Sequence, residues 1–573
     1  MSSIRAFLRD LWTLTRPYWF SDERWAARGL LAAVVALNLG IVYINVLMNK
    51  WQNNFYNSLQ DKDINAFYTL IGQFSLLAAA YIVAAVYQLY LNQMLQIRWR
   101  RWLTDRYLGD WIGGRIYYRM QLTDRGTDNP DQRISEDLAL FVDKTLALTL
   151  GLLSAVVTLG SFVAILWSLS GTLEFALGNT QVTIPGYMVW VALLYAIVGT
   201  WLVHLVGRPL IGLNFNQQRF EANFRFSLVR FRENTESIAI YGGEAGETRG
   251  LSRRFVDVVN NWWEIMRRQK KLSWLRSGYG QVAILFPYVV AAPRYFSGAI
   301  QLGGLMQTAS AFSQVQDALS WFVSAYVQLA EWKATVDRLT GFQAAMTHAR
   351  TAEKADADIA ATTAGAALEA QALKLDLPDG KPLIAPFDAR IAPGESVLVT
   401  GPSGSGKSTL FRAFAGIWPF GGGRLVKPDA RVLFLPQKPY LTIGTLREQL
   451  AYPASADAFD EMAYQTALAD CGLPALAGRL DEEQHWALIL SPGEQQRIAF
   501  ARAFLHKPQW LFLDEATSSL DEAGEAALYR ALRDKLPGAT VVSIGHRAAL
   551  AAFHKRRLRI ERGEGGVGTL VPA

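Results

Sequence analysis

Six apolar runs constrain the fold of this chain more than any other feature, because each is long enough to cross a lipid bilayer. They lie near 29–48, 66–94, 145–169, 186–206, 277–297 and 307–331. The hydrocarbon core of a bilayer offers no partner to backbone N–H and C=O groups, so a run of about 20 apolar residues crosses it as a helix. The sequence therefore predicts a membrane α-helical bundle with six transmembrane helices.

The charges beside these runs predict their orientation. Arginine and lysine crowd the segments near 98–133 and 208–271, whereas the connections near 49–65, 170–185 and 298–306 hold few of them. Because basic loops stay on the cytoplasmic side of a membrane, both termini are expected in the cytoplasm. Residues 1–24, with several Trp and Arg, are expected to form an interfacial helix on membrane lipid. The net charge of +7 then needs no nucleic acid partner, and no nucleic-acid-binding motif accompanies it.

A change in composition divides the chain into domains. Residues 346–368 are rich in Ala, Thr and Asp and carry no aromatic ring, which predicts a linker. From 369 onward, short apolar strand-like runs alternate with helical patterns, as in an α/β domain. The predicted organisation is a transmembrane domain at 1–345, the linker, and a cytoplasmic α/β P-loop ATPase domain at 369–573.

A glycine-rich loop carries the clearest chemical signal in the second half. It follows the strand-like run 396–400, precedes the helix-like run 410–414, and matches the pattern G-x-x-x-x-G-K-[ST]. Its glycines let backbone N–H groups surround phosphate oxygens, its lysine reaches the β- and γ-phosphates, and its first serine after the lysine binds Mg²⁺. A turn that binds nothing is the alternative, and the strand–loop–helix context argues against it. The candidate nucleotide-binding residues are Gly401, Pro402, Ser403, Gly404, Ser405, Gly406, Lys407, Ser408 and Thr409.

Another strand-like run, 510–513, ends in two carboxylates. Asp514 would bind Mg²⁺ together with Ser408, and Glu515 would polarise the attacking water. Acidic residues often follow strands by chance, but this pair follows a P-loop. Together the two motifs predict an ATPase that uses ATP and Mg²⁺.

Four further motifs, in order along the chain, resemble those of the ABC transporter family. Gln437 matches the family's Q-loop, the stretch 490–497 (Leu-Ser-Pro-Gly-Glu-Gln-Gln-Arg) its signature, the stretch 518–521 its D-loop, and His546 its switch histidine. The resemblance implies an exporter-type fold and a half-transporter that works as a homodimer with two composite ATP sites.

The same resemblance implies roles for individual residues. Gln437 and His546 would join Glu515 in catalysis, and Gln437 would also bind Mg²⁺. The further nucleotide-binding residues would be Ser491, Gly493, Glu494 and Asp521. Pro492 departs from the family's usual glycine, so a contact made through that backbone N–H would be lost.

Five further stretches of the chain narrow the resemblance to one branch of this family. The segments 128–134 and 233–244 look like those of the branch that contains peroxisomal acyl-CoA and lysosomal cobalamin transporters. The segments 291–298, 305–312 and 439–446 resemble bacterial SbmA/BacA-like proteins, and those with a fused ATPase (YddA-like proteins) resemble the chain over nearly its whole length. This likeness implies an inner-membrane location and uptake of hydrophilic cargo, such as peptides, bleomycin-like compounds or cobalamin.

Polar residues in the sixth apolar run bear on the cargo. They recur every three or four positions and therefore share one face of a helix. Charged groups inside a membrane usually face a cavity or a partner, so two such faces across a dimer would line a hydrophilic, somewhat acidic space. Hydrogen bonding between helices, or proton coupling through the two acids, are the alternatives. The substrate-path candidates are Ser310, Gln314, Asp317, Ser324, Gln328 and Glu331.

Three functions fit these features. The first is ATP-driven uptake of bulky hydrophilic compounds, for which the polar helix face favours the cargo and the resemblance alone implies the direction. An exporter or flippase of acyl-CoA, lipid or drug would keep the family and change the cargo or its direction. A membrane-anchored ATPase sensor that transports nothing is the third, and the intact Glu515 and His546 argue against it.

Overall fold

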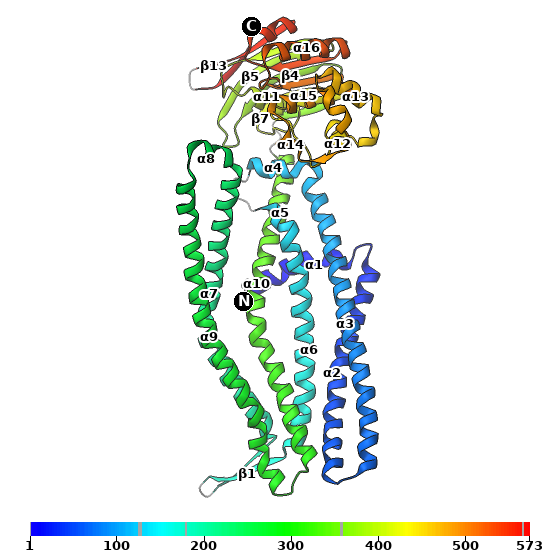
Figure 1. The fold of residues 1–573 in the computed structure, drawn as a ribbon, viewed down its shortest axis with the longest axis vertical. Helices are drawn as coiled ribbons and strands as arrows, with labels where there is room; N and C mark the ends of the chain where they lie inside the picture. The colour runs from blue at the N-terminus through cyan, green and yellow to red at the C-terminus, as the bar shows by residue number, and fades with distance from the viewer. Residues whose placement is uncertain (1, 124–128, 178–179, 356–358, 564–565) are drawn as a thin grey trace. The chain divides into compact units, whose positions relative to one another are not determined.

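The computed structural model describes residues 2–123, 129–177, 180–355, 359–563 and 566–573. The chain divides into two compact units, one of residues 1–115 and 126–345 and the other of 116–125 and 346–573. Figure 1 draws the first as a set of long helices and the second as helices around a sheet. The second unit thus takes in a short piece of the first half of the chain, which composition did not predict.

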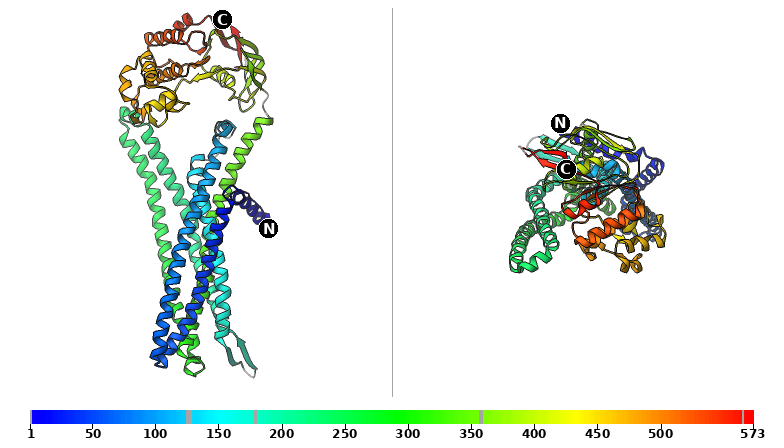
Figure 2. Two further views of the ribbon diagram at one scale, coloured as in Figure 1. Left: turned by 90° about the vertical axis from the view of Figure 1, so that its right-hand side faces the viewer. Right: turned by 90° about the horizontal axis from the view of Figure 1, so that it is seen from above.

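Long helices and one hairpin make up the first unit. The helices are α1 (Ser2–Trp19), α2 (Arg24–Gln60), α3 (Ile64–Ile112), α5 (Pro130–Gln132), α6 (Leu138–Ser170), α7 (Tyr187–Glu233), α8 (Thr235–Tyr241), α9 (Glu244–Phe296) and α10 (Leu302–Ala355). The 3₁₀ turn η1 (Gly113–Arg115) follows α3, and the π-helical turn η2 (Arg133–Asp137) precedes α6. The hairpin of β1 (Thr172–Leu177) and β2 (Thr180–Pro185) joins α6 to α7. Helices α2 and α3 pack as one antiparallel pair, and α7 and α9 as another (Figure 1 and Figure 2).

Four helices of the described residues are long and apolar enough to cross a membrane. They are α2, α3 with its continuation to residue 122, the rod of residues 130–170, and α7. The fifth and sixth predicted spans lie within α9 and α10, whose 53 and 54 residues are long enough. Polar residues such as Arg294 and Asp317 interrupt their apolar runs. The fold is the predicted helical bundle, and the number of six spans stays a prediction.

Side-chain amides join α2 to the beginning of α10. Asn49 Nδ2 donates to the Gln307 carbonyl oxygen at 3.1 Å, and Gln307 Nε2 donates to Asn49 Oδ1 at 3.1 Å. Asn53 Nδ2 donates to Gln307 Oε1 at 2.5 Å, and Asn57 Oδ1 accepts from the Gly303 N–H at 2.8 Å. Such pairs satisfy polar groups where lipid offers no partner, so they set the register of α10 against α2.

We expect Gly303→Val to loosen this end of the bundle. A Cβ at Gly303 would lie 2.0 Å from the Asn53 carbonyl oxygen, so a side chain there forces the two helices apart. Broken amide bonds and overpacking should cost roughly 1–3 kcal/mol, seen as a lower melting temperature of the purified protein. Gly72→Val is the matched control, because nothing lies within 4 Å of a Cβ there. Equal shifts for the two variants would contradict this close approach.

The second unit is built on a sheet in which ten of the described strands take part, in the order β3-β7-β4-β5-β14-β13-β6-β12-β11-β8. The neighbours β13, β6, β12, β11 and β8 run parallel, so their carboxyl ends meet at one edge. The strands are β3 (Ile359–Gly365), β4 (Leu368–Asp376), β5 (Pro382–Ile391), β6 (Ser396–Thr400), β7 (Gly421–Pro428), β8 (Val432–Leu435), β11 (Trp510–Asp514), β12 (Thr540–Ile544), β13 (Arg556–Arg562) and β14 (Gly568–Pro572).

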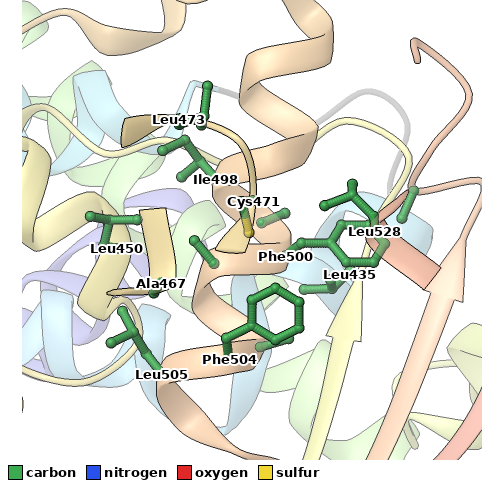
Figure 3. Packing of buried hydrophobic residues seen from close by; sticks show 14 of the residues in the cluster. Leu435, Leu450, Ala467, Cys471, Leu473, Ile498, Phe500, Phe504, Leu505 and Leu528 are labelled. Atoms are coloured by element: carbon green, nitrogen blue, oxygen red, sulfur yellow. The ribbon is translucent and has the colours of Figure 1, made fainter. Parts of the chain in front are cut away.

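Helices cover this sheet and fill its core. They are α4 (Ile116–Thr123), α11 (Lys407–Phe414), α12 (Leu446–Ala451), α13 (Glu461–Asp470), α14 (Trp486–Ile489), α15 (Pro492–His506) and α16 (Glu522–Lys535). Short 3₁₀ turns η3 (Ala456–Ala458), η4 (Pro474–Arg479) and η5 (Ala548–Phe553), and the two-residue strands β9 (Gly444–Thr445) and β10 (Glu483–Gln484), complete the unit. Figure 3 shows part of the core, where Cys471 packs among Leu450, Phe500 and Phe504. Burial raises the pKa of the Cys471 thiol, so this residue acts as a small apolar side chain.

The segment 346–368 is not the linker that its composition predicted. Helix α10 continues to Ala355, and β3 then pairs in parallel with β7 at the edge of the sheet. Alanine is the strongest helix former, which favours the continued helix. The strand is held by backbone hydrogen bonds to a distant segment, and a local composition of small polar residues does not reveal these.

Helix α4 belongs to the second unit although it follows α3 in the chain. Ile116 and Met120 are buried, and Leu122 packs against the apolar cluster of β6, β11 and α11. Ile116 and Met120 lie four residues apart and therefore share one face of this short helix.

Candidate nucleotide-binding and catalytic site

The P-loop lies between β6 and α11 as the sequence predicted. Gly404 and Gly406 have φ angles of +73° and +94°, which glycine adopts at little cost. A Cβ at Gly406 would also lie 3.1 Å from Leu383 Cγ, so the loop packs closely on the start of β5. Because α11 begins at Lys407, the N–H groups of its first turn lie next to the loop, where they attract phosphate.

Polar groups around the loop fit a nucleotide with Mg²⁺. Lys407 Nζ donates to the carbonyl oxygens of Gly401 and Pro402, each at 2.9 Å. Ser405 Oγ is buried, and the described residues offer it no hydrogen-bond partner, which suits a ligand oxygen. Ser408 Oγ donates to Asp514 Oδ1 at 3.1 Å, and Mg²⁺ prefers such oxygen ligands. The ion, when held by these two groups, neutralises charge on phosphate oxygens.

Glu515 lies between the two other residues assigned to catalysis. Its Oε2 accepts a hydrogen bond from Gln437 Nε2 at 3.1 Å, and its Oε1 lies 3.0 Å from His546 Nε2. These residues follow β8, β11 and β12, three neighbouring parallel strands that deliver them to one edge of the sheet. Glu515 has a φ of +49°, a left-handed conformation that is uncommon for non-glycine residues. A carboxylate held this way is able to accept a proton from an attacking water.

The surroundings of Asp514 should make Mg²⁺ binding depend on pH. Burial raises the pKa of Asp514, against the effect of the Ser408 hydrogen bond. Because only the ionised carboxylate binds the metal, a raised pKa lets protons compete at a higher pH than at an ordinary aspartate. We expect the Mg²⁺ concentration for half-maximal ATPase activity to rise about tenfold per pH unit below that pKa. Mg²⁺ titrations from about pH 7 down to the ordinary aspartate pKa of about 4 check this, and a midpoint that stays constant over that whole range would contradict it.

The signature residues lie at the start of α15. Ser491 is the N-cap, and its Oγ accepts from the Glu494 N–H at 3.3 Å. Glu494 Oε2 in turn accepts from the Ser491 N–H at 2.9 Å and from Ser491 Oγ at 2.7 Å. Pro492 takes the first helical position, where an N–H would have no partner within the helix, so proline suits this site. Gly493 follows it, and a Cβ there would lie 3.2 Å from the Ser519 carbonyl oxygen.

Asp521 lies at the N-cap of α16. Its Oδ1 accepts from the Gly524 N–H at 3.1 Å, and no hydrogen bond or ion pair between its carboxylate and the P-loop occurs in the described part of the chain. Its contribution to nucleotide binding, like those of Ser403 and Thr409, stays a prediction.

Two polar side chains beside the catalytic group have no role assigned from the sequence. Gln496 is 2% exposed and forms hydrogen bonds with the backbone of Gln437 and with Ser518 and Ser519. Arg547 Nη2 donates to the Ser518 carbonyl oxygen at 3.3 Å. Gln496 lies within the signature stretch 490–497 and Arg547 follows the switch histidine, and these positions were the only signal in the sequence.

The polar face of α10 is on the surface of the first unit. Asp317, Gln328 and Glu331 are exposed, and Ser310 and Gln314 are partly exposed. The opposite face of the helix is buried in the bundle through side chains such as Phe312.

One of the two acidic side chains on this face has its charge balanced by a lysine. Glu331 Oε2 lies 3.2 Å from Lys144 Nζ, whereas Asp317 takes part in none of the ion pairs among the described residues. The side chain of Ser324 lies outside the described residues. The face is therefore less acidic than the sequence predicted.

Comparison with known proteins covers both units. Residues 14–296 match the family model described as ABC transporter transmembrane region 2, and residues 384–518 match the model described as ABC transporter. The chain is 36% identical to the inner membrane ABC transporter ATP-binding protein YddA of Escherichia coli (strain K12), over 95% of this chain and 96% of that protein. It is 30% identical to the lysosomal cobalamin transporter ABCD4 of Mus musculus, over 96% of this chain and 93% of that protein. The structure of a bacterial Atm1-family ABC exporter with ATP bound has the same fold, with a TM-score of 0.72 and 17% identity over 93% of each chain.

Proposed function

Because this chain belongs to the ABC transporter family, in the branch that includes YddA and the ABCD transporters, we propose that it takes up bulky hydrophilic compounds across a bacterial inner membrane. Family membership makes it a multi-pass membrane protein that couples hydrolysis of ATP, with Mg²⁺, to transport. The cargo we propose is a peptide or a cobalamin-like or bleomycin-like molecule.

The exposed polar face of α10 is the observation that supports a hydrophilic cargo. A face of serines, glutamines and Asp317 is costly against lipid, so it needs water, a partner helix or cargo beside it. A free lipid would leave these groups without hydrogen bonds, whereas a hydrophilic cargo satisfies them. The printed function of the cobalamin transporter relative agrees with a bulky polar cargo.

A homodimer is the proposed working form. The chain holds one membrane unit and one ATPase unit, and Glu515 and His546 are both present. Two copies would then carry two competent ATP sites, each completed by Ser491 and Gly493 of the other copy. The basic segments near 98–133 and 208–271 support a cytoplasmic side for the ATPase unit and both termini.

Cellular accumulation tests cargo and direction together. Cells that lack the transporter would carry wild type or Glu515→Gln at matched expression and receive a labelled proline-rich peptide or labelled cobalamin. Uptake predicts more label in wild-type cells than in the mutant. Less label in wild-type cells would show export and overturn the proposed direction. Equal amounts of label in wild-type and mutant cells would exclude the peptide and cobalamin as cargoes.

Asp317→Asn and Glu331→Gln test the polar face of α10. Asp317→Asn should reduce uptake of a cationic peptide, because it removes the acid that has no ion-pair partner among the described residues. Glu331→Gln should change uptake less, since Lys144 already compensates that charge. Equal losses of uptake and of folded protein in both variants would point to helix packing instead.

A further inference from the structure

A closed ring of hydrogen bonds surrounds the catalytic glutamate. Gln437 Nε2 donates to Glu515 Oε2 at 3.1 Å, and the Gln437 carbonyl oxygen accepts from Gln496 Nε2 at 3.1 Å. The same Nε2 donates to Ser518 Oγ at 3.1 Å, and the Ser518 N–H donates to the Glu515 carbonyl oxygen at 3.0 Å. The ring runs through three segments that lie far apart in the chain.

Gln496 lies in the signature stretch 490–497, and the residues matched in that stretch leave it without an assigned role. Its Oε1 accepts from the Ser519 N–H at 2.9 Å while its Nε2 has two acceptors, so both ends of the amide are used. The side chain is 2% exposed, and a buried amide that is fully hydrogen-bonded holds its partners in one arrangement. A carboxylate or an apolar side chain cannot make this set of contacts.

We infer that Gln496 is a positioning residue for ATP hydrolysis. Its hydrogen bonds connect the backbone of Gln437 to the turn after Glu515. They therefore fix the position from which the side-chain amide of Gln437 donates to the catalytic carboxylate. Because Gln496 lies on α15, whose N-cap is the signature Ser491, a shift of this helix would reach Glu515 through Gln437 and Ser518. The inference concerns the basal ATPase and does not depend on the proposed cargo or direction.

Gln496→Glu tests this role. The new carboxylate still accepts from the Ser519 N–H, but it places an oxygen against the Gln437 carbonyl oxygen and displaces that backbone. We expect kcat to fall roughly tenfold or more. The KM for ATP should stay within about twofold, because the P-loop is untouched. Ser518→Ala, which removes one bond at an exposed residue, should lower kcat less, and the two changes together should cost less than the product of their separate effects.

Gln449→Glu is the matched control. Gln449 is 0% exposed and its Nε2 donates to the Thr445 carbonyl oxygen on α12, away from Glu515. Both glutamates should lower the melting temperature, but only Gln496→Glu should lower kcat per folded molecule. Equal kcat losses in the two variants, or a raised KM at unchanged kcat, would overturn the inference. Should Gln496→Glu fail to fold, a wild-type kcat in Ser518→Ala would overturn it.

Discussion

Glu515→Gln is expected to lower ATP turnover about 100-fold to 10,000-fold, the range in which a general base contributes. The amide keeps the shape of the side chain and still accepts a hydrogen bond from Gln437, but it cannot take a proton from water. Since Lys407, Ser408 and Asp514 are unchanged, ATP should still bind. Phosphate release and the binding of a fluorescent ATP analogue, measured on the same preparation, separate these two effects.

Glu522→Gln provides the control for this result. Glu522 lies in the exposed first turn of α16, one residue after Asp521, and its neutralisation should leave turnover within about twofold of wild type. Glu515→Gln with near wild-type turnover would exclude Glu515 as the base. A parallel loss of nucleotide binding would assign it to binding instead.

Asp137→Ala is expected to cause the largest loss of stability in the first unit. Asp137 is 2% exposed and accepts from Arg338 Nε at 2.9 Å and Arg338 Nη2 at 2.6 Å. It also accepts from Arg133, which is itself 6% exposed. Removing the acid breaks a buried ion pair and takes this carboxylate from both arginines, which costs about 3–5 kcal/mol. The melting temperature of the purified protein measures this loss.

Asp337, which directly precedes Arg338 in the chain, provides the matched control for Asp137→Ala. It pairs with Lys333 at 2.5 Å on the surface, with 51% and 54% of the two side chains exposed. Exposed pairs contribute at most about 1 kcal/mol, so Asp337→Ala should shift the melting temperature little. Similar shifts for Asp137→Ala and Asp337→Ala would show that the pair of Asp137 with Arg133 and Arg338 adds no more than a surface ion pair.

Much of this protein follows from its sequence because the relevant signals are local. An apolar run needs only its own backbone bonds to cross a membrane as a helix, which is why the bundle was predictable. The P-loop was predictable for the same reason, because Gly404, Gly406 and Lys407 lie within four residues of one another. Capping by Ser491 and Glu494 is also local, although the sequence signalled only a family motif there.

Other features depend on which distant segments become neighbours. The order of β8, β11 and β12 along the chain does not indicate that these strands are adjacent in the sheet. Their adjacency nevertheless places Gln437 and His546 next to Glu515. Composition could not show that β3 pairs with β7, that α4 packs in the second unit, or that Lys144 compensates Glu331.

The sequence by itself determined the membrane bundle, the ATPase chemistry and the family. Only the tertiary structure decided how Gln496 closes the ring around Glu515 and that α4 packs in the second unit. The physical reason is that helices, loops and caps are satisfied by neighbours in the chain. The free energy of the whole packed unit determines the strand order, the long-range hydrogen bonds and the ion pairs.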